Sequence, residues 1–108
     1  MKISFKTKKI ENLCNKRDKA IRELGNDCSD KLQLRLSQLS SIEFLEDMKY
    51  GNPHPLKGNK KGQFSISLEG GFRLVFEAIK PIPKTSDNAI FWQKVTVINI
   101  VFIGDYHE

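Results

Sequence analysis

The residues best suited to chemistry on a phosphodiester are two histidines and a set of basic side chains. The protein has two histidines, His54 and His107. A histidine that titrates near neutral pH serves as a general acid or base, and lysine or arginine stabilises negative charge on phosphate oxygens. The candidates occur at three places along the sequence: His54, Lys57, Lys60 and Lys61; Arg73; and Asp105, Tyr106 and His107.

Several of these candidates also have a purely structural interpretation. Arg73 offers a planar fork for phosphate oxygens, but its spacing to Glu77 also favours an ion pair on one strand face. His107 is either a proton-transfer group or an exposed side chain. Phe91 and Trp92 are candidates for base stacking, although aromatic residues in such a segment more often belong to the core. The residue types alone therefore leave these alternatives open.

The net charge of +5 is concentrated in the middle of the chain. Residues 49–84 carry seven basic and two acidic side chains, whereas residues 1–48 have a net charge of +2 and residues 85–108 of −2. A concentrated basic region favours a polyanionic partner such as RNA or DNA. A solvated, lysine-rich loop explains the same pattern, so charge alone does not choose between the two.

The length and composition indicate a single domain that we expect in the cytoplasm. The chain has 108 residues, 39% of them hydrophobic, and no stretch approaches the ~20 apolar residues of a membrane span. The N-terminal segment lacks the long apolar region of a secretory signal. Cys14 and Cys28 are therefore expected to be reduced thiols, and their spacing gives no reason to expect zinc or another metal.

The N-terminal half predicts one strand and two or three helices. Lys2–Phe5 alternates between polar and apolar residues, as in a strand. A helix is expected from the N-cap Thr7 to the terminating Gly25, with a break near Lys16. A second helix starts at Asp27 or Ser29, has its own apolar stripe and breaks at the serine pair 40–41. Residues 42–48 are expected to add another helical turn.

The C-terminal half predicts strands. Residues 51–62 form a loop, after which Gln63–Leu68 and Phe72–Phe76 alternate. A three-residue connection at 69–71, with glycine in the left-handed conformation, places Leu68 opposite Phe72 and aligns the apolar faces. Arg73 then lies on the polar face, away from the helices.

A long loop and a buried strand complete the expected fold. Residues 80–88 contain two prolines and are interpreted as a connection. Phe91–Ile103 is apolar on both faces, which is typical of a strand inside a sheet. The expected fold is thus α+β, with two or three N-terminal helices packed on one face of a mainly antiparallel sheet of about four strands.

Four segments together resemble the HigB toxins, the plasmid maintenance killer branch of the RelE/ParE superfamily of type II toxin–antitoxin systems. They are His54–Ile66 (HPLKGNKKGQFSI), Phe72–Glu77 (FRLVFE), Val95–Ile100 (VTVINI) and Asp105–His107 (DYH). The resemblance covers nearly the whole chain. It implies a compact RelE-like domain that cleaves mRNA in the ribosomal A site without a metal or other cofactor.

The resemblance also implies site residues and partners. It carries catalytic roles to His54, Lys57, Arg73, Asp105, Tyr106 and His107, with Lys60 and Lys61 expected to bind RNA. The implied partners are a cognate antitoxin, usually a helix-turn-helix protein, together with the ribosome and mRNA. We expect no membrane partner and a monomeric toxin outside the antitoxin complex.

Two departures from the family pattern and two alternative functions accompany this interpretation. Gly71 stands where relatives often carry a polar residue such as asparagine, and the 80–88 loop is longer than in the shorter HigB proteins. The first alternative is a ParE-like toxin that acts on DNA gyrase without nuclease activity. The second is an inactive RNA-binding or ribosome-binding module.

Overall fold

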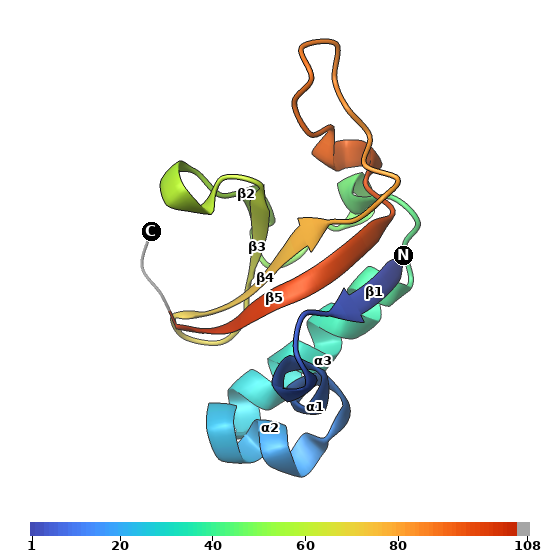
Figure 1. Cartoon of the computed structure of the whole chain (residues 1–108). Helices are drawn as coiled ribbons and strands as arrows, with labels where there is room; N and C mark the ends of the chain where they lie inside the picture. The colour runs from blue at the N-terminus through green and yellow to red at the C-terminus, as the bar shows by residue number, and fades with distance from the viewer. Residues whose placement is uncertain (106–108) are drawn as a thin grey trace.

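A computed structural model describes residues 1–105. Its five strands form a single mixed sheet (Figure 1). Their order across the sheet is β1-β5-β4-β3-β2. β1 pairs in parallel with β5, and the other neighbouring strands are antiparallel. The mainly antiparallel sheet agrees with the prediction, which did not anticipate the two-residue strand β2. The strands are β1 (Lys2–Phe5), β2 (His54–Pro55), β3 (Gln63–Ser67), β4 (Phe72–Ala78) and β5 (Val97–Asp105).

Three helices occupy the N-terminal half: α1 (Lys8–Asn15), α2 (Arg17–Leu24) and α3 (Asn26–Ser40). The Thr7 hydroxyl caps α1 by accepting a hydrogen bond from the Ile10 N–H. Lys16 is extended and separates α1 from α2, and Gly25 ends α2 with a φ of +84°. The predicted cap, break and stop are all confirmed, and α3 starts one residue before the expected range.

The segment after α3 differs from the expectation. Residues 42–48 do not continue the helix but contain a separate 3₁₀ turn at Leu45–Asp47. None of the helices in the described chain is long and apolar enough to cross a membrane.

The hydrophobic core lies between α3 and one face of the sheet. Leu32 and Leu39 from α3 are fully buried, as are Ile66, Leu74 and Phe76 from the strands. Figure 1 shows α3 running beside the sheet, with α1 and α2 at one end of it. Both cysteines are free and buried, as expected of reduced thiols. The opposite face of the sheet carries no helix in the described chain.

The β3–β4 hairpin has the predicted register. Ile66 pairs with Leu74, and the Leu68 N–H donates to the Phe72 carbonyl at 2.9 Å. Gly70 takes the left-handed position with a φ of +62°. The apolar faces of the two strands therefore coincide.

The last strand begins later than predicted and contains a bulge. Residues Trp92–Lys94 form a 3₁₀ turn instead of strand, and Trp92 packs against Phe64 with ring centroids 4.9 Å apart. The register of β5 against β4 shifts between Val75 and Phe76. Phe102 pairs with Val75 whereas Ile100 pairs with Phe76, so β5 holds one extra residue. This bulge sends Phe102 to the helix-free face.

Candidate functional site

The helix-free face of the sheet collects several of the predicted site residues. Because side chains alternate along strands, residues paired across neighbouring strands point to the same face. Two adjacent rows of pairs cross this face. The first is His54–Ser65–Val75–Phe102, and the second is Ser67–Arg73–Gly104. The predicted position of Arg73, on the face shared with Ser65 and Ser67, is thus confirmed.

His54 and Arg73 share this face of the sheet but are not direct neighbours on it. They lie two strands and one row apart, which in regular sheet geometry is about 10 Å across and about 7 Å along the strands. Both side chains are half-buried.

Part of the helix-free face is buried from solvent, and the sequence did not predict this burial. Ser65 and Val75 are completely or almost completely buried, and so is Leu56, which follows β2. Val75 and Leu56 nevertheless lie outside the main hydrophobic core. The Ser65 hydroxyl is buried, and the described residues provide no hydrogen-bond partner for it. Low polarity beside Arg73 strengthens electrostatic interactions with a bound anion.

Arg73 makes no ion pair with any carboxylate within residues 1–105. Its Nη1 donates to the Phe72 carbonyl at 3.1 Å. The alternative ion pair with Glu77 is wrong because four residues of strand separate the two Cα atoms by about 13 Å. A half-buried guanidinium without a carboxylate partner on the described chain suits an external anion.

The lysines lie on a turn that directly follows β2. A 3₁₀ turn covers Gly58–Lys60, and the three side chains at Lys57, Lys60 and Lys61 are exposed. The Lys60 N–H donates to the Lys57 carbonyl at 3.2 Å, which closes the turn. The predicted loop at 51–62 thus contains the short strand β2 and this 3₁₀ turn, and Lys57 lies three residues after His54.

The C-terminal candidates are only partly described. Asp105 is exposed at the end of β5, where it pairs with Phe72. A Cβ on Gly71 would come 2.7 Å from the Asp105 Oδ1, so the carboxylate lies against the hairpin backbone. Tyr106 and His107, both predicted to be catalytic, lie outside the described residues.

The sequence did not predict the roles of Asn52 and Phe102 on or beside this face, nor the burial of Ser65. Asn52 accepts a hydrogen bond from His54 through its carbonyl, and the Asn-Pro pair at 52–53 was a usable turn signal. Phe102 has 39% of its surface exposed, an unusual state for a phenylalanine within a strand. No sequence signal assigns it to this face, because the bulge reverses the alternation.

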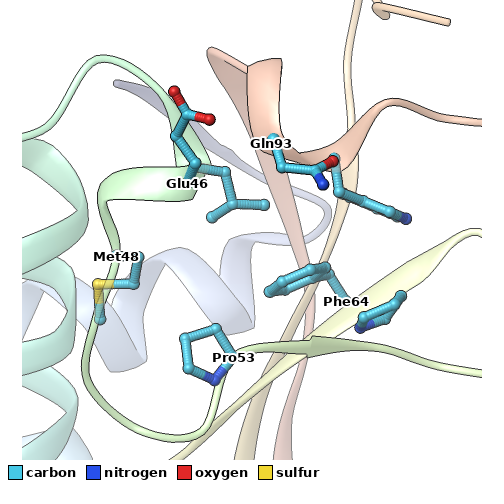
Figure 2. A pocket seen from close by; sticks show the side chains of 8 residues that line it. Glu46, Met48, Pro53, Phe64 and Gln93 are labelled. Carbon is cyan, nitrogen blue, oxygen red and sulfur yellow. The ribbon is translucent and has the colours of Figure 1, made fainter. Parts of the chain in front are cut away.

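A groove of about 390 Å³ lies away from these residues, on the side of Phe64 and Trp92. Figure 2 shows Met48, Pro53 and Phe64 around it, with Glu46 and Gln93 at one end. Pro53 and Pro55 line the groove, whereas His54 between them belongs to the other face by strand alternation. Trp92 contributes to this packing, which favours its core interpretation over base stacking.

Metal and thiol chemistry find little support in the described chain. No group of three His, Cys, Asp or Glu side chains within residues 1–105 is arranged to hold a metal ion. Burial raises the pKa of the Cys14 thiol to about 12, and burial also raises the pKa of Cys28. Both thiols therefore stay protonated and unreactive at neutral pH.

No family model matches the sequence, and no curated protein matches it significantly. Solved structures do match. The YoeB/ParE toxin from Agrobacterium tumefaciens has a TM-score of 0.60 and 13% identity, over 99% of this chain and 100% of that chain. The YoeB–YefM complex from Staphylococcus aureus has a TM-score of 0.59 and 19% identity, over 100% and 98% of the two chains.

A YoeB dimer from Staphylococcus aureus is also similar, with a TM-score of 0.57 and 21% identity over 100% of this chain and 98% of that chain. The helices, the sheet and nearly every residue are therefore included in each comparison. The chain shares its α+β fold with these YoeB-type and ParE-type toxins.

Proposed function

We propose that this chain is the toxin of a type II toxin–antitoxin system and a ribosome-dependent mRNA endoribonuclease. The observation that carries the proposal is Arg73, half-buried on the helix-free face and without a carboxylate partner in residues 1–105. His54 shares this face, and the exposed Lys57, Lys60 and Lys61 follow His54 closely along the chain. Similarity to the toxin structures supports the toxin role. The closer assignment to the HigB branch rests on the sequence motifs.

The proposed reaction needs no metal or cofactor. A base takes the proton of a ribose 2′-hydroxyl, the 2′-oxygen attacks the adjacent phosphorus, and the 5′-oxygen leaves with a proton from an acid. The products are a 2′,3′-cyclic phosphate and a 5′-hydroxyl. Arg73 and Lys57 stabilise the charge of the pentacovalent phosphorane, and one such contact contributes on the order of 3 kcal/mol.

Proton transfer is assigned to His107, a role worth roughly 10²–10⁴-fold in rate. Tyr106 and Asp105 position His107 or the nucleotide. Lys60 and Lys61 hold the RNA backbone through charge. We further propose that the protein acts in the cytoplasm, where ribosomes are.

A cognate antitoxin is the second proposed partner. The similarity to the toxin chain of the YoeB–YefM complex supports an antitoxin that neutralises this chain. The helix-turn-helix type of that antitoxin follows from the HigB resemblance. We expect a short gene for such a protein next to the gene of this chain. We also expect its product to co-purify with this chain.

The deciding experiment is translation of a defined mRNA on purified ribosomes, with cleavage mapped by primer extension. Wild type, Arg73→Ala and His107→Ala are compared with naked mRNA. Arg22→Ala is the matched control, because it removes the same charge from an exposed position on α2. We expect cuts at A-site codons that require ribosomes, persist in the control and vanish in both test variants.

Two results contradict the proposal. Uncut mRNA with a folded, growth-inhibiting wild type removes the nuclease and leaves the gyrase-type toxin. Salt-sensitive ribosome binding without either cleavage or growth inhibition leaves an RNA-binding or ribosome-binding module.

A further inference from the structure

His54 is held at one ring nitrogen by the backbone. Its Nδ1 lies 2.8 Å from the Asn52 carbonyl oxygen. A carbonyl only accepts hydrogen bonds, so Nδ1 must carry the proton that is shared in this bond. In the neutral imidazole the lone pair is then on Nε2. The hydrogen bond thus selects one of the two tautomers.

The carbonyl is aimed by an unusual turn. Gly51 has a φ of +82° and Asn52 a φ of +49°, so two consecutive residues are left-handed. Asparagine tolerates this region better than most residues that carry a Cβ. Pro53 and Pro55 fix the backbone φ on either side of His54. The ring is therefore presented by a backbone with few alternative conformations.

The turn is anchored to the core. The Gly51 carbonyl accepts a hydrogen bond from the Ser67 N–H at 2.7 Å. A Cβ on Gly51 would come 2.6 Å from the Ile66 Cγ2 and 2.8 Å from the Arg35 Nε. Arg35 in turn donates from Nε to the Ser67 carbonyl at 3.2 Å. The turn is thus packed against both β3 and α3, which leaves room for nothing larger than glycine at position 51.

We infer that the Gly51–Asn52 turn is a positioning device that holds the neutral His54 ring in its Nδ1–H tautomer, with the lone pair on Nε2. Asn52 is a positioning residue, acting through its carbonyl. The next step rests on the proposed nuclease function: the His54 Nε2 takes the proton of the ribose 2′-hydroxyl as the 2′-oxygen bonds to phosphorus. The bond from phosphorus to the 5′-oxygen breaks, and that oxygen takes its proton from the acid of the proposed reaction.

The tautomer is measured directly by long-range ¹H–¹⁵N NMR of ¹⁵N-labelled protein at alkaline pH, where imidazole is neutral. The shifts of protonated and unprotonated ring nitrogens differ strongly. The chain has two histidines, and His54→Gln assigns their signals. We expect a protonated Nδ1 and an unprotonated Nε2 at His54 in the wild type.

Two substitutions at Asn52 test the turn. Asn52→Gly keeps the left-handed conformation accessible and is expected to keep the tautomer and the cleavage rate. Asn52→Val disfavours that conformation because valine is β-branched, so the carbonyl moves, both tautomers appear and mRNA cleavage falls about tenfold or more. Asn88→Val is the matched control. Asn88 is the other left-handed non-glycine residue of the described chain, has a φ of +68° and lies in the long loop.

The outcomes separate this inference from the proposed function. A wild type that cleaves mRNA but carries the proton on Nε2 overturns the inference alone. A folded Asn52→Val with an unchanged tautomer also overturns it. A wild type with the expected tautomer but no cleavage upholds the positioning and overturns the nuclease. If Asn52→Val does not fold, the wild-type spectrum still decides.

Discussion

The carboxylate of Asp105 lies so close to Gly71 that a Cβ at position 71 would come 2.7 Å from its Oδ1. Gly71 does not have a left-handed φ, so alanine fits its backbone. The absence of a side chain at this position therefore leaves the space that the carboxylate occupies.

Gly71→Ala is predicted to impair cleavage by displacing the Asp105 carboxylate. Single-turnover cleavage should fall to about the level of Asp105→Ala, and the double variant should show no further loss. The free energy of unfolding should change by less than about 0.5 kcal/mol because Asp105 is exposed.

Gly70→Ala is the control for this comparison of the single and double variants at positions 71 and 105. Gly70 is left-handed with open space around its Cβ position. Its substitution should cost about 1 kcal/mol of stability and leave the effect of Asp105→Ala unchanged. Additive effects of Gly71→Ala and Asp105→Ala would contradict the predicted displacement.

Replacement of Lys57, Lys60 and Lys61 by alanine is predicted to weaken RNA binding through charge. For single-stranded RNA, three lost phosphate contacts should reduce the slope of log K against log salt concentration by about 2. The measurement is a salt titration of binding to a short RNA whose 2′-hydroxyls are methylated, so that it cannot be cleaved. Removing three cations from α2, at Arg17, Lys19 and Arg22, is the charge-matched control. An equal change in slope for both triple variants would show that binding follows net charge alone.

Phe76 and Phe102 are predicted to differ sharply in their contribution to stability. Phe76 is fully buried and stacks on Phe64 with ring centroids 5.4 Å apart, whereas Phe102 is 39% exposed. Phe76→Ala should lower the free energy of unfolding by about 3–5 kcal/mol, and Phe102→Ala by less than about 1 kcal/mol. Urea unfolding followed by circular dichroism gives both values. Similar losses would mean that the helix-free face is packed as tightly as the core.

The Cys14 thiol is predicted to make stability depend on pH in the alkaline range. Burial raises its pKa to about 12 in the folded chain, and an unfolded thiol has a pKa near 8.5. The folded state therefore binds more protons between these values, so this stabilisation is complete below about pH 8.5 and is lost as pH rises toward 12. Urea unfolding at pH 8 and pH 10.5 should show a smaller decrease for Cys14→Ala than for wild type. Parallel decreases would contradict the assignment.

The sequence was most informative where hydrophobic periodicity was strong. The hairpin of β3 and β4 followed from a period of two on each strand, and the requirement that Leu68 face Phe72 fixed its register. That register also placed Arg73 on the helix-free face. The cap signals at Thr7 and Gly25 also predicted helix boundaries correctly, because a cap depends only on residues that are close in sequence.

Features that depend on distant contacts were missed. The segment from Phe91 to Ile103 is apolar on both faces and has no period, so neither the start of β5 at Val97 nor its bulge was visible. β2 is only two residues long, contains Pro55 and follows Pro53, so it is too short to recognise. The burial of Ser65, between His54 and Val75 on neighbouring strands, depends on pairing that only the folded chain brings about.

The parallel pairing of β1 with β5 has a consequence for folding kinetics. Lys2 pairs with Val97, so the contact that places β5 inside the sheet closes a loop of nearly the whole described chain. Closing ~95 residues costs about 4 kcal/mol of chain entropy beyond a constant term, before the sheet returns any energy. Such non-local contacts slow folding. During synthesis the hairpin of β3 and β4 can pair locally, but β1 can join the sheet only after β5 has left the ribosome, because β5 is its one sheet neighbour in the described chain.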